Sequence, residues 1–287
     1  MSRYVLKDKV GLVTGAARGI GFATARALVS RGASVVVVDL EPEAAEAAAA
    51  RLHETRAIGL AADVRDRGAL QQAVAASVER FGGLDVVVAN AGISPRAATF
   101  RAMATESFDR VIEVNLMGVV KTVEAALPEI VRNSGHVVVV ASIQAFQNGA
   151  GVAPYAMSKA AVEQFGRALR VELRQHGASA SVAYFGFIDT EIVHRGIDAD
   201  PVVNTMVAAI PKPLRQRLQP QVAGEAIVRG IEHRAPRIIR PRVWAAISAL
   251  RGMLNPLSDL QLERDKRLQA AVRDLDAGAG DEQPNTT

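Results

Sequence analysis

Short, strongly apolar runs alternate along the chain with longer segments in which apolar residues recur at helical spacing. The apolar runs are 10–15, 33–40, 57–63, 84–92, 135–142, 180–185 and 237–241, and each is continuous rather than alternating. A continuous apolar run is typical of a strand covered on both faces, as the strands of parallel sheets are. The pattern therefore predicts about seven buried parallel strands.

The segments between these runs carry good helix formers at helical periodicity. They predict helices near 19–31, 42–54, 66–81, 104–131, 154–176 and 221–233. Parallel strands need crossover connections, which such helices supply. The expected fold class is therefore α/β, a single doubly wound parallel sheet with helices on both faces. We assign it to residues 1–242, followed by a C-terminal helical extension over 243–275 and a disordered tail over 276–287.

The composition agrees with one compact domain. The chain has 287 residues, 49% of them hydrophobic, which is enough for a large core. It has no cysteine, which excludes disulfides and thiolate metal sites and is compatible with the cytoplasm. The first residues lack the apolar core of a signal peptide, and no apolar run reaches the roughly 18 to 20 residues of a membrane-spanning helix. We expect a cytoplasmic protein.

The first predicted strand is followed by the string TGAARGIG. Gly15, Gly19 and Gly21 let the backbone turn tightly and approach a pyrophosphate, and the next helix, which contains Ile20, offers N–H groups to the negative charge. The spacing is G-x3-G-x-G rather than the G-x-G-x-x-G of the common dinucleotide fingerprint. The alternative is a glycine-rich turn that binds no ligand.

The second predicted strand ends at Asp39, whose carboxylate is expected to bind the adenosine ribose hydroxyls. Unit charges about 4 Å apart at an effective dielectric of about 20 repel by roughly 4 kcal/mol, so Asp39 disfavours a 2′-phosphate. Arg18 could pair with that phosphate, but it could equally be exposed or paired with a surface carboxylate. We expect NAD as the cofactor, with NADP as the alternative.

Two further strand ends carry candidate cofactor contacts. Asp63, next to Val64, is expected to bond the adenine amino group, and a strand-end cap is the alternative. The segment Asn90-Ala91-Gly92 is small enough for the backbone to lie against a cofactor, although a plain turn uses the same residues.

Tyr155 and Lys159 lie four residues apart in the predicted helix 154–176, so they share one face of it. Lys159 is one of six lysines in a chain with twenty-eight arginines. Lysine carries a compact ammonium whose pKa burial can move. A phenol has a pKa near about 10, and a fixed ammonium close by favours the phenolate and lowers that pKa. The pair is a candidate for acid–base chemistry, with Lys159 tuning Tyr155.

These residues, with Asn115 in VNLMG and Ser142 after the fifth strand, resemble the short-chain dehydrogenase/reductase family over roughly residues 6–240. The resemblance rests on the order Thr-Gly-x3-Gly-Ile-Gly, Asp, Asn-Ala-Gly and Ser, then Tyr thirteen positions later, then Lys. It implies a Rossmann-like fold and an oxidoreductase that passes hydride between a nicotinamide cofactor and a secondary alcohol or ketone. It also implies a homodimer or homotetramer built on the helices near 104–131 and 154–176.

The resemblance implies a role for each catalytic candidate. Tyr155 is the general acid/base and lies against the cofactor, and Lys159 holds the nicotinamide ribose. Ser142 holds the substrate oxygen, and Asn115 anchors a water in a proton relay that leads to Lys159. Such a matched transfer of hydride and proton needs no metal.

The chain departs from the family pattern after the sixth strand, where Phe185 stands in place of a proline before Gly186. Without the fixed φ of proline the loop start is freer, and the expected cofactor contacts there are Gly186, Ile188 and Thr190. Phe146 and Phe185 are expected to line the substrate site with Ser142 and Tyr155, with residues 192–214 as a lid. The substrate would then be apolar and bulky, of steroid, terpenoid or fatty type. The alternative is that Phe185 and the neighbouring Phe187 fill core.

Other functional classes fit less well. The five histidines lack any metal-ligand spacing, and neither a G-x-S-x-G elbow nor a P-loop string occurs. The alternative to an enzyme is a catalytically silent dinucleotide-binding regulatory or scaffold protein of the same fold.

The extension carries a helical apolar stripe of Val243, Ile247, Leu250 and Leu254 with Trp244 beside it, and a second helix is expected after Pro256. Residues 212–273 hold thirteen basic and five acidic side chains. One interpretation is that the stripe packs on the protein itself or a second subunit and covers the substrate pocket. The other is peripheral membrane contact through residues 240–275, with Arg240, Arg242 and Arg251 at an anionic lipid surface. No nucleic-acid-binding motif accompanies the charge, so nucleic acid is not an expected partner.

Overall fold

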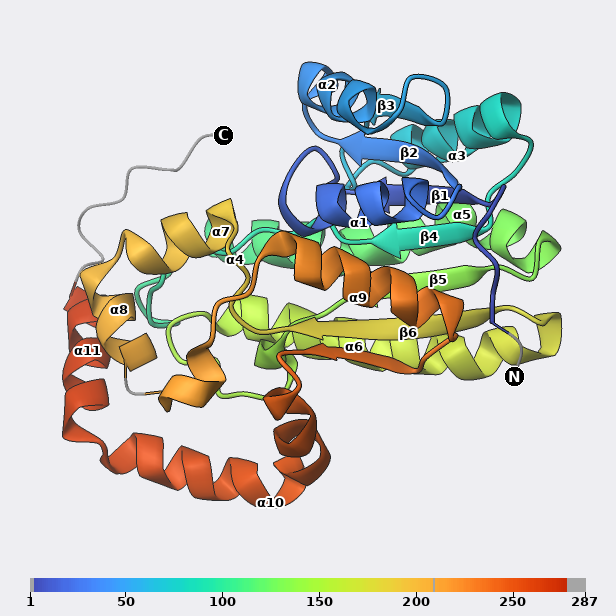
Figure 1. The fold of residues 1–287 in the computed structure, drawn as a ribbon. Helices are drawn as coiled ribbons and strands as arrows, with labels where there is room; N and C mark the ends of the chain where they lie inside the picture. The colour runs from blue at the N-terminus through green and yellow to red at the C-terminus, as the bar shows by residue number, and fades with distance from the viewer. Residues whose placement is uncertain (1–2, 209, 278–287) are drawn as a thin grey trace.

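The computed structural model describes residues 3–208 and 210–277, and its centre is one seven-stranded parallel sheet (Figure 1). The strand order is β3-β2-β1-β4-β5-β6-β7, with every neighbouring pair parallel. The strands are β1 (Val10–Thr14), β2 (Ser34–Asp39), β3 (Ala57–Ala61), β4 (Val86–Ala89), β5 (His136–Val140), β6 (Ser179–Phe185) and β7 (Arg237–Arg240). This confirms the predicted Rossmann-like α/β fold.

Helices cover both faces of the sheet. The helices of the main body are α1 (Gly19–Val29), α2 (Pro42–Leu52), α3 (Arg67–Phe81), α4 (Thr105–Ile112), α5 (Gly118–Arg132), α6 (Ala153–Glu172), α7 (Glu191–Val193), α8 (Pro201–Ala208) and α9 (Pro220–Glu232). The core residues of α3, α5 and α6 form one cluster with the sheet, and those of α1, α2 and α9 form another. The valine-rich strands are therefore buried on both sides, as their continuous apolar character predicts.

Small residues let α1 and α9 pack closely on the second face. A Cβ added at Gly224 of α9 would lie 2.5 Å from the backbone of Ala23 in α1. A larger residue at either position would push the helices apart, because close-packed interiors leave no room for an extra methyl group. The α1–α9 contact holds α1, the helix that follows the glycine-rich loop, against the sheet.

The single helix predicted over 104–131 is interrupted. A π-helical turn, Glu113–Met117, joins α4 to α5 and buries Asn115 completely. One extra residue in a helical turn barely changes the spacing of the apolar residues, so the sequence did not reveal this interruption. Such π turns occur often at functional sites.

The C-terminal extension consists of α10 (Val243–Arg264) and α11 (Lys266–Ala277), which returns to lie beside α8 (Figure 1). The helix break expected at Pro256 is wrong, because α10 continues through this proline. The break comes at Asp265, whose side chain accepts hydrogen bonds from the N–H groups of Arg267 and Leu268 and so caps α11. Residues 276 and 277, which we assigned to a disordered tail, end α11, and residues 278–287 lie outside the described residues.

A histidine lies in the core between two neighbouring strands. His136, the first residue of β5, is fully buried, and its two ring nitrogens lie 2.7 Å from Ser179 Oγ and 2.8 Å from Ser181 Oγ in β6. Burial, aided by the positive charges of Arg234 and Arg170, lowers the pKa of His136 to about 3. His136 is therefore a neutral structural residue at neutral pH.

Candidate active site

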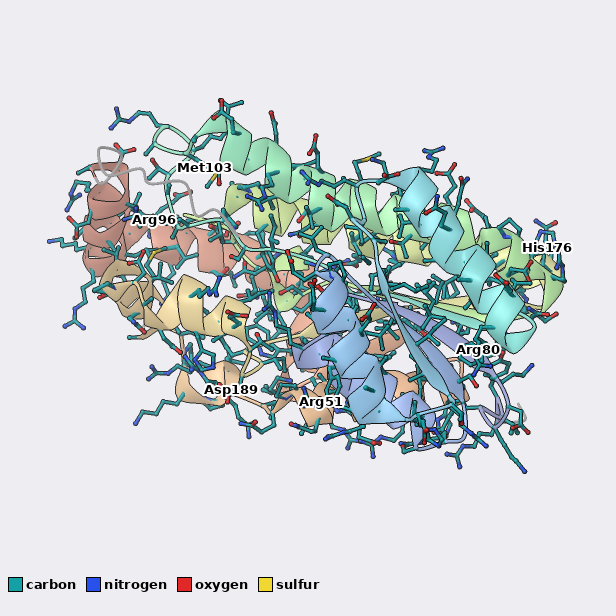
Figure 2. The ribbon with its side chains drawn as sticks, turned by 90° about the horizontal axis from the view of Figure 1, so that it is seen from above. Arg51, Arg80, Arg96, Met103, His176 and Asp189 are labelled. Atoms are coloured by element: carbon teal, nitrogen blue, oxygen red, sulfur yellow. The ribbon has the colours of Figure 1, made fainter. Side chains whose placement is uncertain are left out.

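The carboxyl ends of the strands open into one large cleft of about 1970 Å³. Ligand pockets usually measure roughly 300 to 1,000 Å³, so this cleft has room for a dinucleotide and a second small molecule together. Two of its lining residues, Arg96 and Met103, lie toward the end of the molecule where the C-terminal helices are, whereas Arg80 and His176 lie at the opposite end (Figure 2).

Most of the predicted site residues line this cleft. They are Gly15, Arg18, Gly19, Ile20, Asp39, Asp63, Val64, Asn90, Ala91, Gly92, Ser142, Tyr155, Lys159, Phe185, Gly186, Ile188 and Thr190. Three predicted residues do not line it: Gly21, Asn115 and Phe146. The fold thus gathers groups from six strand ends in one place, and their individual roles remain predictions.

The glycine-rich loop has the geometry of a phosphate cradle. Gly15 and Gly19 adopt φ angles of +62° and +58°, which disfavour any residue with a side chain. A Cβ at Gly21 would overlap the carbonyl oxygen of Gly15, so this glycine keeps the loop tight from below the cleft. No side chain caps the amino end of α1, which leaves its first N–H groups available to an anion.

Thr14, at the end of β1, is a residue that the sequence reasoning missed. Its hydroxyl accepts hydrogen bonds from the backbone N–H groups of Asn90 and Ala91, at 3.1 and 3.2 Å. Asn90 Nδ2 in turn donates to the carbonyl oxygens of Thr14 and Gly15, at 2.9 and 3.1 Å. These bonds tie the glycine-rich loop to the end of β4. A buried threonine directly before the first glycine was the available signal.

Asp39 braces the same loop from the β2 side. Its carboxylate accepts hydrogen bonds from the N–H groups of Ala17 at 2.8 Å and Leu40 at 2.9 Å. Arg18 points elsewhere, since its guanidinium lies 3.1 Å from a carboxylate oxygen of Glu191. Asp39 is expected to favour NAD and Arg18 to favour NADP. The Asp39 carboxylate is thus fixed in the cleft, whereas the Arg18 guanidinium is paired with a carboxylate.

Asp63 is also engaged with a basic neighbour. The Arg65 side chain donates to both of its carboxylate oxygens, and this hydrogen bonding holds the pKa of Asp63 below its usual value. Val64 is buried and fills the space beside Gly118, where a Cβ would lie 2.6 Å from Val64 Cγ2. An adenine amino group bound at Asp63 would therefore share the carboxylate with Arg65, which already binds it.

Three of the four catalytic candidates meet at the end of β5. Ser142 and Lys159 are buried and Tyr155 is half-buried, and the Tyr155 phenol is hydrogen-bonded to Ser142. Lys159 Nζ donates to the carbonyl oxygen of Val140 at 3.0 Å and lies 5.6 Å from the centroid of the Tyr155 ring. A phenol, a hydroxyl and an amine therefore face one part of the cleft.

Burial controls the electrostatics of this group. It raises the pKa of Tyr155, an effect that the hydrogen bond with Ser142 partly offsets, and it lowers the pKa of Lys159 to about 8. The expectation that Lys159 lowers the pKa of Tyr155 is wrong for this structure. Loss of hydration disfavours the charged form of each group.

Asn115 holds the segment after β4 rather than facing the cleft. Its Oδ1 accepts from the N–H of Ile93 at 2.7 Å, and its Nδ2 donates to the carbonyl of Ile93 at 2.8 Å. A Cβ at Gly92 would lie 3.2 Å from Asn115 Oδ1 and 3.4 Å from Lys159 Nζ, so both side chains flank this glycine. The predicted water relay through Asn115 stays a prediction.

The two aromatic residues predicted to line the substrate site, Phe146 and Phe185, lie in different places. Phe185 is buried, lines the cleft, and its carbonyl lies 3.4 Å from the Ser142 hydroxyl. Phe146 is 4% exposed and lies in the core, with ring centroids 5.9 Å from Tyr184 and 6.3 Å from Trp244. Trp244 also donates to the Leu214 carbonyl. The structure therefore brings Phe185 to the site and leaves Phe146 among other aromatic side chains.

Helix α11 adds a wall that the sequence reasoning placed outside the main domain. Asp274 and Leu275 line the cleft, and Leu275 packs over Gly151, where an added Cβ would lie 2.9 Å from it. Asp276 fastens the end of α11 to the segment after β4 by accepting hydrogen bonds from Thr99 and Arg101. The C-terminal extension thus closes one side of the cleft. Within residues 3–208 and 210–277, no group of three acidic or histidine side chains is arranged to hold a metal ion.

Comparisons with known proteins agree with this geometry. The family model described as "short chain dehydrogenase" matches residues 9–200. The chain is 36% identical to the cis-4-hydroxycyclohexanecarboxylate dehydrogenase of Sinomonas cyclohexanicum, over 77% of this chain and 88% of that protein. It is 32% identical to the 2-(R)-hydroxypropyl-CoM dehydrogenase of Xanthobacter autotrophicus, over 71% of this chain and 84% of that protein.

Among the solved structures with a similar fold is one that was determined with a nicotinamide cofactor. The 3-ketoacyl-(acyl-carrier-protein) reductase of Brucella melitensis, complexed with NADH, matches with a TM-score of 0.71 and 25% identity. The match covers 83% of this chain and 99% of that structure.

Proposed function

Because the chain belongs to the short-chain dehydrogenase/reductase family of oxidoreductases, we propose that it interconverts a secondary alcohol and a ketone with NAD as hydride carrier. The observation that carries this proposal is the meeting of Ser142, Tyr155 and Lys159 in the cleft beside the glycine-rich loop. The two dehydrogenases named above act on hydroxyl-bearing substrates by their names, which supports the CH–OH chemistry.

A nicotinamide dinucleotide fits the residues present. The tight turn at Gly15 and Gly21 leaves no room for side chains, and the uncapped start of α1 suits a pyrophosphate. When bound, the cofactor supplies or accepts hydride at its nicotinamide. In this proposal Asp39 accepts from the adenosine ribose, and Asp63 with Val64 lies at the adenine. Gly186, Ile188 and Thr190 would lie along the nicotinamide half, because they follow β6 in the same cleft.

The proton of the reaction belongs to Tyr155. Ser142 orients the substrate oxygen toward the phenol, which donates its proton during ketone reduction and accepts one during alcohol oxidation. Since burial raises the pKa of Tyr155, the phenol is the dominant form at neutral pH and favours reduction there. Lys159, with its pKa near 8, exchanges its own proton close to neutral pH, and we assign it to the nicotinamide ribose.

We propose NAD rather than NADP because of the two charges at the ribose end. Asp39 is held in place by two backbone N–H groups, whereas Arg18 is paired with Glu191. A 2′-phosphate would have to displace Glu191 and approach Asp39. That combination supports the cofactor with free ribose hydroxyls.

The cleft lining holds a group of apolar residues together with charged ones such as Arg96, Glu106 and Asp274, and the apolar group supports our proposal of a bulky, lipophilic alcohol or ketone. Its apolar lining includes Ile93, Pro95, Ala97, Ala98, Met103, Ile192, Val193, Val202 and Leu275. We infer that Phe185 and Leu275 bound this apolar group from opposite sides. A steroid, terpenoid or fatty alcohol has the required shape and polarity.

Assembly and location complete the proposal. We propose a homodimer or homotetramer built on α4–α5 and α6, supported by the exposed apolar side chains of Met157 and Val171 on α6. A cysteine-free chain is compatible with the cytoplasm. We also propose peripheral membrane contact through residues 240–275. Among the described residues no helix is long and apolar enough to cross a membrane.

The test is a screen of secondary alcohols and ketones with NAD and NADP in parallel, read by nicotinamide absorbance. We expect turnover of at least one bulky apolar substrate with NAD, and loss of turnover in Tyr155→Phe with NADH binding retained. A Tyr155→Phe protein that turns over at the native rate would remove the proposed mechanism. NADH binding without turnover of any substrate would favour the regulatory alternative, and a preference for NADP would show that Arg18 overrides Asp39.

A further inference from the structure

Helix α10 is fixed to the protein along one side only. Of its 22 residues, Trp244 and Ser248 are buried. Its inner side is held by polar contacts, which include a two-bond ion pair from Arg251 to the buried Glu163 of α6 and a 3.0 Å hydrogen bond from Asn148 to Asp259. The helix therefore presents its other side to solvent in a fixed orientation.

That outer side is apolar along most of the helix. Val243, Leu250, Met253, Leu257 and Leu260 are 38%, 51%, 69%, 66% and 43% exposed. They recur at intervals of seven, three, four and three residues, which is the spacing of one helix face. Thirteen large hydrophobic residues are strongly exposed in the described chain, and five of them belong to this face. Such a concentration marks an interaction surface.

The structure divides the stripe predicted from the sequence. Trp244 is buried and Ile247 and Leu254 are half-buried, whereas Val243 and Leu250 belong to the exposed face. Arg251 is bound to Glu163, and Arg240 is half-buried with its guanidinium on the Ile239 carbonyl. The basic groups that flank the exposed face are instead Arg242 at its start and Arg264, Lys266 and Arg267 at its end.

The acidic side chains of this segment do not balance those charges. Residues 240–267 hold six basic and three acidic residues, and without the engaged Arg240 and Arg251 four basic residues face the three acidic ones. Asp259 accepts its bond from Asn148, Asp265 caps α11, and Glu263 is the third acid. Two copies of the face paired antiparallel would place the Arg242 end of one against the Arg264–Arg267 end of the other. Like charges then meet at both ends, which disfavours a second copy as the occupant.

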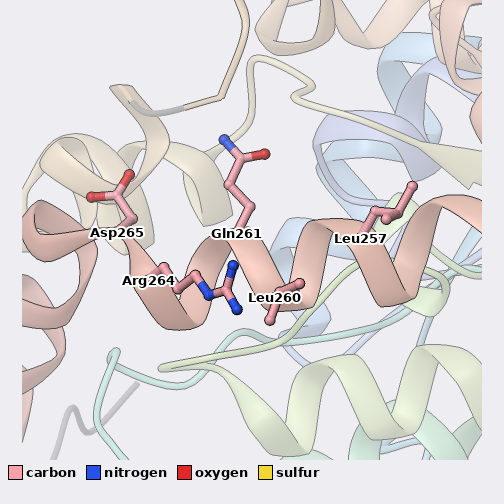
Figure 3. A pocket seen from close by; sticks show the side chains of 5 residues that line it. All are labelled: Leu257, Leu260, Gln261, Arg264 and Asp265. Atoms are coloured by element: carbon pink, nitrogen blue, oxygen red, sulfur yellow. The ribbon is translucent and has the colours of Figure 1, made fainter.

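At the C-terminal end of the exposed face lies an open pocket that is lined by both apolar and charged side chains. Leu257 and Leu260 line it with Gln261, Arg264 and Asp265, and its volume is about 440 Å³ (Figure 3). An apolar floor beside a guanidinium suits an acyl chain with a phosphate head. From these observations we propose that the outer face of α10 lies on an anionic phospholipid bilayer, with Leu250, Met253, Leu257 and Leu260 among the acyl chains and the flanking basic groups at the phosphates.

This inference deepens the membrane contact of the proposed function, yet its test does not depend on turnover. The full chain is sedimented with phosphatidylcholine vesicles and with vesicles that also contain phosphatidylserine, at low and high salt. We expect binding to the anionic vesicles that weakens with salt. Leu257→Glu should abolish it, whereas Val5→Glu, at an equally exposed apolar position far along the chain, should leave it unchanged.

A second variant isolates the charge. Lys266→Glu with Arg267→Glu should weaken binding by about fivefold or more for each basic residue removed. Light scattering on the same proteins, without vesicles, tests the rival occupant. The proposal is overturned if the full chain stays in the supernatant with anionic vesicles at low salt, or if Val5→Glu loses binding as Leu257→Glu does. It is also overturned if Leu257→Glu reduces the oligomeric state of a protein that binds no vesicles, since the face would then belong to a second copy.

Discussion

Acidification should destabilise this protein through one buried histidine. His136 lies fully inside the core with its ring nitrogens on Ser179 and Ser181, so its one unprotonated ring nitrogen could gain a proton only by creating a charge in a dry environment. Its pKa falls from the ordinary 6.5 to about 3 on folding. The unfolded chain therefore binds more protons at this position between these two values. The contribution of His136 to stability is complete above about pH 6.5 and is lost progressively as the pH falls toward 3.

The size of the effect follows from the two pKa values. At pH 5 an unfolded histidine with a pKa of 6.5 is almost fully protonated, whereas a folded one with a pKa near 3 is almost fully neutral. The linkage relation then gives a loss of about 2 kcal/mol in the free energy of unfolding between pH 7 and pH 5 from this residue alone. That is a large part of the roughly 5 to 15 kcal/mol that keeps a typical domain folded.

The assay is urea unfolding of the native chain, His136→Gln and His136→Asn at pH 7 and pH 5. Both substitutions keep a polar neutral side chain and remove the titration. The other ionisable groups are the same in all three proteins, so they cancel in the comparison. We expect the native chain to lose about 2 kcal/mol more than either variant on acidification, at unchanged m-value. Equal losses in all three proteins would refute the assignment of acid sensitivity to His136.

Three further predictions concern the cleft. Thr14→Val leaves two backbone N–H groups after β4 without their acceptor and should cost about 1 to 3 kcal/mol in urea unfolding, whereas Thr14→Ser keeps the hydroxyl and should unfold like the native chain. Gly21→Ala should abolish NADH binding by fluorescence titration while circular dichroism stays native, and Gly252→Ala, whose Cβ meets nothing within 4 Å, should bind normally. Leu275→Ala should lower the KM of substrates larger than the native one, measured across a size series, and an unchanged size ranking would contradict its place in the wall.

The fold was predictable because its signals are local. Each strand carries its own run of valine or isoleucine, and each crossover helix carries its own periodicity, so neighbouring residues decide the assignment. The π turn at Glu113–Met117 was not predictable, since one extra residue leaves apolar spacing nearly unchanged. The phase of α10 depends on Leu214, thirty residues away, whose carbonyl accepts from the Trp244 ring and draws it inward. A helical stripe in the sequence does not say which side another segment will cover.

The candidate site divides in the same way. Gly15, Gly19 and Tyr155 line the cleft, and they could be predicted as site residues because the proposed chemistry requires those residue types at fixed positions along the chain. The pKa shift of Tyr155 was predicted in the wrong direction, because the burial that raises it is a property of the packed cleft. Leu275 was missed because α11 reaches the cleft only after α10 has carried the chain away from β7 and Asp265 has turned it back.

The position of α11 has a consequence for how the molecule is made and how it can diversify. Translation supplies the strands, the glycine-rich loop and Tyr155 well before residues 266–277, so a nascent chain can assemble its sheet while one wall of the cleft is still unmade. The gene therefore encodes the reacting groups and the α11 wall of the cleft in separate segments. Changes confined to the last codons of this segment alter the shape offered to a substrate at Leu275 and leave the reacting groups untouched. Mutations in this late segment of the gene could therefore change the substrate that is accepted without altering the proposed catalytic residues encoded earlier.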